Sequence, residues 1–233
     1  MSPDLARRLG SKFIVFDGID GAGKGAQLSL LEAAIKAHGL EVVRARDPGG
    51  TAIGDRIRHV LLDYDLSEMD VRCEAFLFMA SRAQLAREVI EPAIRSGAVC
   101  LGDRYVSATC AYQGAAGFDP GKVVELAKFA IGDTWPHLTI VLDVPATAGL
   151  ARTGRKPVAA RKGANGGARH PTLFHDVHTD AMESRPLEFH QKVREMFRQL
   201  SAYYPAPVRM VDGTGSVEDV QSRVLEAISD AIR

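Results

Sequence analysis

A glycine-rich segment followed by a lysine is the part of this sequence best suited to carry out chemistry. Residues 13–25 read FIVFDGIDGAGKG and fit the pattern G-x-x-x-x-G-K. Glycines let backbone N–H groups converge on phosphate oxygens, the start of the following helix adds a positive dipole end, and the lysine adds a charge. We predict phosphate binding here instead of an ordinary strand-to-helix turn. The residues concerned are Gly18, Ile19, Asp20, Gly21, Ala22, Gly23, Lys24 and Gly25.

The position after the lysine departs from the usual pattern. Ser or Thr normally follows this lysine and its hydroxyl contacts Mg²⁺, but the chain has Gly25 there. Because Mg²⁺ keeps several water ligands in proteins, a water can occupy the position of the missing hydroxyl.

Short apolar segments alternate with helical ones along the chain. The predicted strands are 13–16, 41–46, 98–102, 138–144 and 208–211, and the predicted helices are 26–38, 54–62, 68–95, 123–131, 186–200 and 217–232. This alternation predicts an α/β fold with an open parallel sheet covered on both faces. Ligands of such sheets bind beyond the carboxyl ends of the strands. We therefore expect the functional residues just after the strands.

Charged residues do follow the third predicted strand. Asp103 at its end is placed to hold Mg²⁺ directly or through water, although an aspartate there can also cap the next helix. Asp143, after the fourth strand, is a weaker candidate for the metal. Arg104 adds a forked guanidinium that suits a phosphate group.

Helix 68–95 carries a polar–aromatic–polar stripe. Glu74, Phe78 and Arg82 are spaced i, i+4 and i+8, so they share one face of the helix. This face suits a wall beside a nucleic base, with Phe78 stacking on the ring and Arg82 donating to a carbonyl. The alternative is that Phe78 belongs to the core, as buried aromatic residues usually do.

Residues 152–179 form a long basic and glycine-rich stretch after the fourth strand. Such loops are functional lids or disordered segments, and we predict a mobile cationic lid here instead of a surface insertion. Its second half holds His170, His175 and His178 with Asp176. These side chains fit no metal-binding spacing, so we interpret them as part of a solvated loop.

Composition narrows the class of protein. With 233 residues and 46% hydrophobic residues, the chain suits one large domain with a sizeable core. Lys plus Arg and Asp plus Glu are both 29, so no overall field favours nucleic acid or a membrane surface. Three cysteines without metal-ligand spacing, no signal peptide and no long apolar run predict a cytoplasmic protein.

Five separate blocks, in order, resemble the thymidylate (dTMP) kinases, a family of nucleoside monophosphate kinases. They are FDGIDGAGKG, RDPGGTAIGDRIR, EAFLFMASRAQ, DRYVSATCAYQGAAG and LTIVLDVP. The resemblance implies a three-layer P-loop NTPase fold with a five-stranded parallel sheet, one domain over residues 1–233, and a homodimer. It implies phosphoryl transfer from Mg-ATP to dTMP, giving dTDP and ADP in dTTP synthesis. Two alternatives stay open: a kinase for another deoxynucleoside monophosphate, or a nucleotide-binding regulatory protein without turnover.

The resemblance also implies roles for single residues. The dTMP site would consist of Arg46, Asp47, Arg58, Phe78, Arg82, Arg104, Thr109, Tyr112 and Gln113, with Tyr112 crowding the ribose 2′ position. Residues 18–25 would bind the phosphates of the donor, while Asp103 and Asp17 would organise Mg²⁺. Lys24, Asp103 and Arg104 would act in phosphoryl transfer.

The chain departs from this family in its lid. The family has D-R-x-E at the end of the lid, where this chain reads DAME at residues 180–183, so the lid arginine is replaced by Ala181. An arginine acting on the transferring phosphoryl group contributes about 10³-fold or more in rate. We therefore expect Arg152 or Arg155 to supply the missing charge.

Overall fold

The structure is a computed structural model that describes residues 1–63, 69–154 and 186–232. Its centre is a parallel sheet of five strands in the order β2-β3-β1-β4-β5. This sheet confirms the predicted α/β fold. The strands are β1 (Phe13–Asp17), β2 (Val42–Arg46), β3 (Val99–Asp103), β4 (Leu138–Asp143) and β5 (Val208–Asp212).

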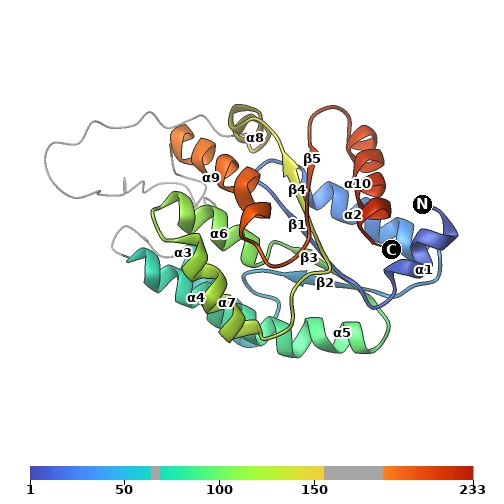
Figure 1. Cartoon of the computed structure of the whole chain (residues 1–233), viewed down its shortest axis with the longest axis horizontal. Coiled ribbons are helices and arrows are strands. Elements are labelled where there is room, and N and C mark those ends of the chain that lie inside the picture. The colour runs from blue at the N-terminus through green and yellow to red at the C-terminus, as the bar shows by residue number, and fades with distance from the viewer. Residues whose placement is uncertain (64–68, 155–185, 233) are drawn as a thin grey trace, which may run out of the picture.

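Helices cover the two faces of this sheet. The helices are α1 (Pro3–Leu9), α2 (Lys24–Lys36), α3 (Ala52–Asp63), α4 (Val71–Leu85), α5 (Glu91–Arg95), α6 (Val106–Ala115), α7 (Pro120–Ile131), α8 (Ala146–Arg152), α9 (Leu187–Gln199) and α10 (Val217–Ala231). Helices α2 and α10 pack together on one face, and α4, α6 and α7 lie on the other (Figure 1). The result is a three-layer α/β/α arrangement.

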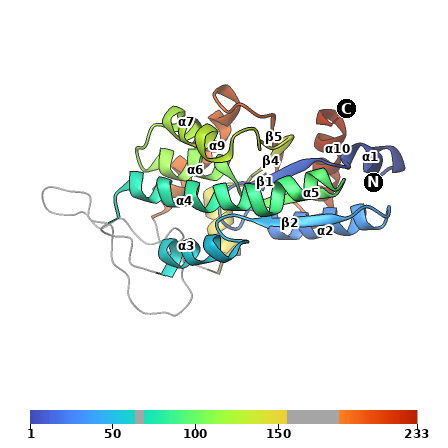
Figure 2. The same ribbon diagram turned by 90° about the horizontal axis from the view of Figure 1, so that it is seen from below.

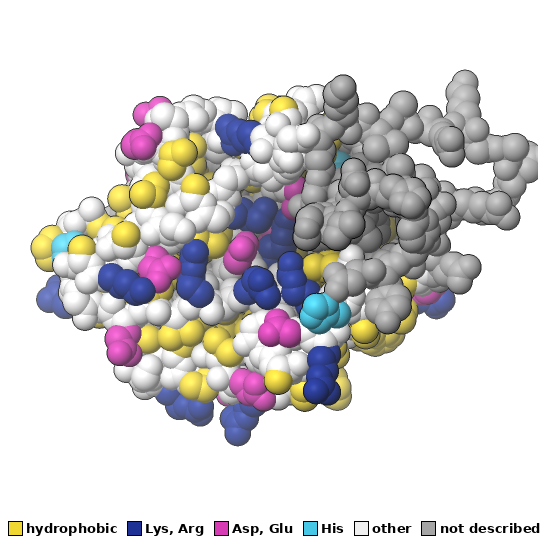
Figure 3. All heavy atoms as spheres, turned by 180° about the vertical axis from the view of Figure 1, so that it is seen from behind, with side chains coloured by type: hydrophobic (Ala, Val, Ile, Leu, Met, Phe, Trp, Pro, Cys, Tyr) yellow, Lys and Arg dark blue, Asp and Glu magenta, His cyan; other side chains and the backbone are white. Residues whose placement is uncertain are grey.

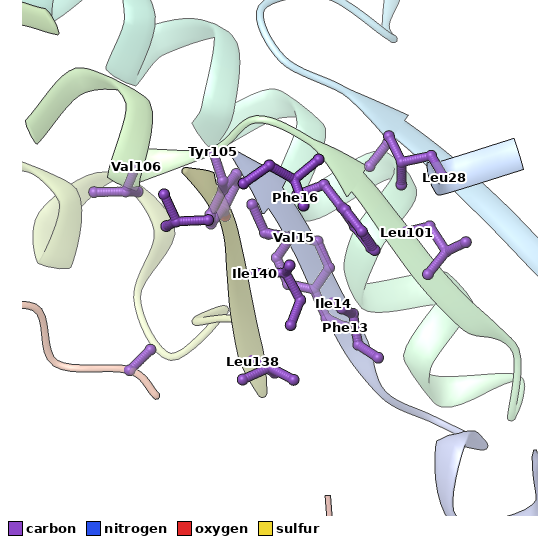
Figure 4. Packing of buried hydrophobic residues seen from close by; sticks show 14 of the residues in the cluster. Phe13, Ile14, Val15, Phe16, Leu28, Leu101, Tyr105, Val106, Leu138 and Ile140 are labelled. Atoms are coloured by element: carbon purple, nitrogen blue, oxygen red, sulfur yellow. The ribbon is translucent and has the colours of Figure 1, made fainter. Parts of the chain in front are cut away.

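The core explains why β1 reads as a continuous apolar run. Both faces of this central strand are covered by helices, so Phe13, Ile14, Val15 and Phe16 are all fully buried. They pack against Leu101 of β3 and residues of β4 (Figure 4). The strand thereby holds the glycine-rich segment that follows it in a fixed place.

Several predicted element boundaries were wrong. The predicted helix 68–95 is α4, a five-residue π-helical turn (Ala86–Ile90) and α5, which follow one another as a single rod (Figure 2). Helices α1, α6 and α8 were not predicted. Residues 106–113 of α6 are buried on every side, so this helix has no alternation of apolar and polar positions to reveal it. Helix α8 ends at Arg152, the first residue of the predicted lid, and residues 155–179 of that lid lie outside the described residues.

Candidate active site

A cleft of about 230 Å³ opens at the carboxyl ends of the strands. It brings together all the residues predicted for the acceptor site, although they come from four different parts of the chain. These are Arg46, Asp47, Arg58, Phe78, Arg82, Arg104, Thr109, Tyr112 and Gln113. Asp20, Lys24 and Asp103 line the same cleft. Basic side chains gather in a hollow on this side of the molecule, with acidic ones beside them (Figure 3).

The glycine-rich segment forms a tight loop between β1 and α2. Gly18, Gly21 and Gly23 have positive φ angles, which side-chain-bearing residues rarely adopt. A Cβ atom at Gly21 would lie 2.0 Å from the carbonyl oxygen of Gly149 in α8, so only glycine fits there. The loop therefore has the backbone shape that the phosphate-binding prediction requires.

Lys24 begins α2 and turns back over the loop. Its Nζ atom donates to the carbonyl oxygens of Gly18 at 3.2 Å and Ile19 at 3.0 Å. Burial, with a further contribution from Arg104, lowers the pKa of Lys24 to about 8. The site thus disfavours the charged form of Lys24, and the negative charge of a bound phosphate would stabilise that form.

Arg104 lies at the centre of the site and is held by acidic groups. Its guanidinium donates to Oδ1 of Asp17 at 3.1 Å, to the carbonyl oxygen of Gly18 at 3.1 Å and to a carboxylate oxygen of Asp20. It also lies 4.9 Å from the ring centre of Tyr112. Arg104 has a φ of 66°, an uncommon conformation for a non-glycine residue that often marks functional sites.

Asp17 is placed beneath the loop and not in the cleft. Its carboxylate is fully buried and accepts from the Gly18 N–H at 3.0 Å, from Arg104 and from Ser107 Oγ at 2.7 Å. Burial raises the pKa of Asp17, and Arg104 opposes this shift. Because these donors occupy both carboxylate oxygens, the placement argues against Asp17 as a direct metal ligand. The carboxylate of Asp17 instead contacts Arg104 directly, and Ser107, which sequence reasoning did not single out, occupies its second oxygen.

Asp103 is the better placed carboxylate for a metal. Its half-buried side chain lines the cleft and has no hydrogen-bond or ion-pair partner among the described residues. The described parts of the chain contain no cluster of three or more metal-ligating side chains. One carboxylate together with substrate phosphates and water is a usual set of ligands for Mg²⁺, so Asp103 fits this ion. Asp143, the other candidate, is instead paired with Arg194 at 2.6 Å and Arg198 at 2.9 Å.

Two residues of the predicted stripe on α4, Phe78 and Arg82, line the cleft, whereas Glu74 is not among the described residues that do so. Arg82 is only 1% exposed, and its Nε atom donates to Oδ2 of Asp47 at 2.5 Å. Its guanidinium carbon lies 5.5 Å from the ring centre of Phe78. Phe78 is 8% exposed and belongs both to the hydrophobic core and to the cleft wall, so the two interpretations of this residue are compatible.

Helix α6 supplies the opposite wall. The hydroxyl oxygen of Thr109 and the amide oxygen of Gln113 are buried and have no hydrogen-bond partner among the described residues. Tyr112 donates its hydroxyl to Asp20 at 3.0 Å, and its ring centre lies 6.3 Å from that of Phe197 on α9. Burial raises the pKa of Tyr112 well above its ordinary value, so the hydroxyl stays protonated.

The remaining predicted cations lie at the edges of the site. Arg46 contacts Asp55 at 3.6 Å, and Arg58 donates to the carbonyl oxygen of Pro48 at 2.9 Å. Arg152, the last residue of α8, donates to the carbonyl oxygen of Gly213 at 3.3 Å, in the loop that follows β5. It is not among the described residues that line the cleft. Arg155 and Ala181 lie outside the described residues.

Comparison with known proteins places this chain in a family. The sequence model of the family described as thymidylate kinase matches residues 16–224. The thymidylate kinase of Citrifermentans bemidjiense is 39% identical over 217 residues, which are 93% of this chain and 90% of that protein. That of Nitratidesulfovibrio vulgaris (strain Miyazaki F) is 35% identical over 221 residues, covering 94% of this chain and 97% of the relative.

A solved structure agrees with the fold. The crystal structure of thymidylate kinase from Ehrlichia chaffeensis matches with a TM-score of 0.69 at 24% identity, over 94% of this chain and 99% of that one. This likeness confirms the predicted P-loop NTPase type of α/β fold. Together with the family match and the relatives, the phosphate loop and its cleft lead to one conclusion: the chain belongs to the thymidylate kinase family.

Proposed function

We propose that the protein transfers a phosphoryl group from ATP to dTMP, giving ADP and dTDP. One observation carries this proposal: Lys24 of the phosphate loop and the acceptor residues on α4 and α6 line the same cleft. Membership of the thymidylate kinase family supports the choice of acceptor. A cleft that joins a donor loop to an acceptor pocket is what direct transfer between two nucleotides requires.

Phosphoryl transfer needs positioning and charge neutralisation more than covalent help from the protein. The loop N–H groups and Lys24 would hold the donor phosphates. Arg104 would exchange its carboxylate partners for phosphate oxygens, since its guanidinium already lies between the loop and the acceptor pocket. Asp103 would hold Mg²⁺ together with phosphates and water, and the ion would neutralise charge on the phosphate oxygens.

The pocket also fits the hydrogen-bonding edge of thymine. A thymine ring offers two carbonyl acceptors and one N–H donor. Arg82 can donate to a carbonyl, while the unpaired oxygens of Thr109 and Gln113 can accept from the N–H group. Phe78 would stack on the ring.

A coupled assay of the purified chain with Mg-ATP tests the function directly. The rates with dTMP, dUMP, dCMP, dGMP and AMP are compared, and dTMP is expected to give the highest kcat/KM. A different preferred acceptor would replace our proposal with a kinase for another deoxynucleotide. Binding of nucleotides without any turnover would point to a regulatory protein.

We further propose that the protein is a cytoplasmic homodimer. Phe76 on α4 and Phe129 on α7 are 56% and 95% exposed, and these two helices pack against each other. Large exposed aromatic side chains on adjacent helices are typical of protein interfaces. The three cysteines are unpaired, which suits a reducing compartment. No helix in the described parts of the chain is long and apolar enough to span a bilayer. Sedimentation of the purified chain is expected to give twice the mass of 25.1 kDa.

Replacing Tyr112 by alanine is expected to narrow the preference for dTMP over its ribonucleotide analogue. The ring of Tyr112 is held by Asp20 and Phe197, so it forms a stiff wall that a 2′-hydroxyl would contact without gaining a partner. Burying a hydroxyl in this way costs about 1–3 kcal/mol, which corresponds to roughly 5- to 150-fold in kcat/KM. Tyr112→Phe is the control, because it keeps the ring and should retain most of the preference. An unchanged ratio in Tyr112→Ala would place the discrimination elsewhere.

A hydroxyl at position 25 is expected to strengthen the binding of Mg²⁺ at the active site. Gly25 is the second residue of α2, it has no positive φ, and a Cβ atom there would meet nothing within 4 Å, so serine fits. Gly25→Ser should lower the Mg²⁺ concentration that gives the half-maximal rate. Gly25→Ala is the control, since it adds the same Cβ atom without an oxygen. If both variants change the Mg²⁺ requirement equally, the hydroxyl is not a metal ligand.

A further inference from the structure

Behind the base pocket, the amide group of Gln113 is paired with a buried carboxylate. The Nε2 atom of Gln113 on α6 lies 3.0 Å from Oε2 of Glu74 on α4. Both residues are almost completely buried, Gln113 at 1% and Glu74 at 4% exposure. Gln113 lines the cleft, whereas Glu74 is not among the described residues that do so. Gln113 therefore links this carboxylate to the cleft.

The chemistry of the pair decides which way the amide of Gln113 points. An ionised carboxylate can only accept hydrogen bonds, so the amide NH₂ group must face Glu74. The amide oxygen is then turned away from the carboxylate. This oxygen is buried without a hydrogen-bond partner among the described residues, in a side chain that lines the cleft. A buried acceptor without a partner is costly, which makes it a strong binding position for a donor on a ligand.

We propose that Glu74 is a positioning residue that sets base specificity by fixing the amide orientation of Gln113. This inference rests on the proposed function and refines its acceptor site. With the amide oxygen of Gln113 turned away from Glu74, the pocket can accept from the N3–H group of thymine. Cytosine carries a lone pair at N3, which would face the same oxygen and be repelled. Glu74 thus favours dTMP over dCMP without touching either nucleotide.

The variant Glu74→Gln separates this role from simple packing. Glutamine has the same shape but can donate as well as accept, so it no longer dictates the orientation of Gln113. We expect the dissociation constant for dTMP, measured by calorimetry, to rise about 10-fold, in line with one lost hydrogen bond. The preference for dTMP over dCMP should fall by about the same factor, and kcat with saturating dTMP should change by less than about threefold.

An exchanged pair provides the rescue. In Glu74→Gln/Gln113→Glu the glutamine at position 74 donates to the new carboxylate, whose second oxygen faces the cleft as an acceptor. This double variant should recover most of the preference for dTMP. Glu88→Gln is the matched control, because Glu88 is exposed on the same rod as α4 and its side chain accepts a hydrogen bond from Gln84. It should leave both dissociation constants unchanged.

The outcomes distinguish this inference from the proposed function. Binding is measured separately from turnover. If the wild-type chain binds dTMP more tightly than dCMP but transfers no phosphoryl group, the proposed function is wrong, and the role of Glu74 in base preference can still be tested. An unchanged dTMP-to-dCMP ratio in a folded Glu74→Gln variant overturns the inference. If thermal unfolding shows that this variant does not fold, Gln113→Leu takes its place. That variant removes the acceptor oxygen, and a retained ratio would equally overturn the proposal.

Discussion

Replacing Lys24 by alanine is expected to lower kcat by about 10²- to 10³-fold. Removing one group that stabilises the charge of a transition state costs about 10²–10³ in rate, and the Lys24 ammonium lies in direct contact with the phosphate loop. The fold should stay intact, because the folded chain already disfavours the charge on Lys24, as its pKa of about 8 indicates. Steady-state kinetics and thermal unfolding measure the two effects.

Lys36→Ala is the matched control for this experiment. Lys36 ends the same helix, is exposed and pairs with Glu32, so its loss should change neither kcat nor stability by much. A Lys24→Ala variant with undiminished activity would contradict the assignment of the phosphate loop. If the Lys24→Ala variant is inactive because it no longer folds, Lys24 supports the structure of the loop and its charge is not the cause of the lost activity. Thermal unfolding identifies that case.

The second large effect is expected from the arginines that follow β4. We propose that Arg152 or Arg155 supplies the cation that Ala181 cannot, so replacing the correct one by alanine should lower kcat by about 10³-fold. The KM for dTMP should change little, because an interaction made mainly in the transition state affects kcat and not ground-state binding. Single variants and the double variant are compared at saturating ATP and dTMP.

The position of Arg152 gives this test a second readout. Its guanidinium lies against the carbonyl oxygen of Gly213, beyond β5, and not in the acceptor cleft. If Arg152→Ala raises the KM for ATP and leaves kcat unchanged, Arg152 contributes to donor binding and Arg155 becomes the candidate for transfer. If the double variant keeps kcat within a few-fold, neither arginine acts on the phosphoryl group. The charge would then come from Arg104, Arg46 or Arg185.

Much of the fold was predictable because its signals are local. Strands β1, β3 and β4 are short apolar runs, and the parallel sheet follows from the alternation of the strands with helices. The buried helix α6 was missed for a physical reason. Residues 106–113 of this helix are all buried, so no polar face alternates with an apolar one and the sequence shows no helical period. This helix nevertheless carries Thr109, Tyr112 and Gln113 of the acceptor pocket.

The sequence by itself determined the phosphate loop and the family, because the loop needs only neighbouring glycines and a lysine, and because the other motifs are contiguous. Only the tertiary structure decided how the charges pair. Arg104 pairs with Asp17 and Asp20, which lie more than 80 residues away in the sequence. Tyr112 bonds to Asp20 at a sequence separation of 92 residues, and Gln113 bonds to Glu74 at a separation of 39 residues. Such partners depend on which strand ends and helices lie side by side. A carboxylate in the sequence therefore does not reveal whether it binds metal, as Asp103 can, or orients an arginine, as Asp17 does.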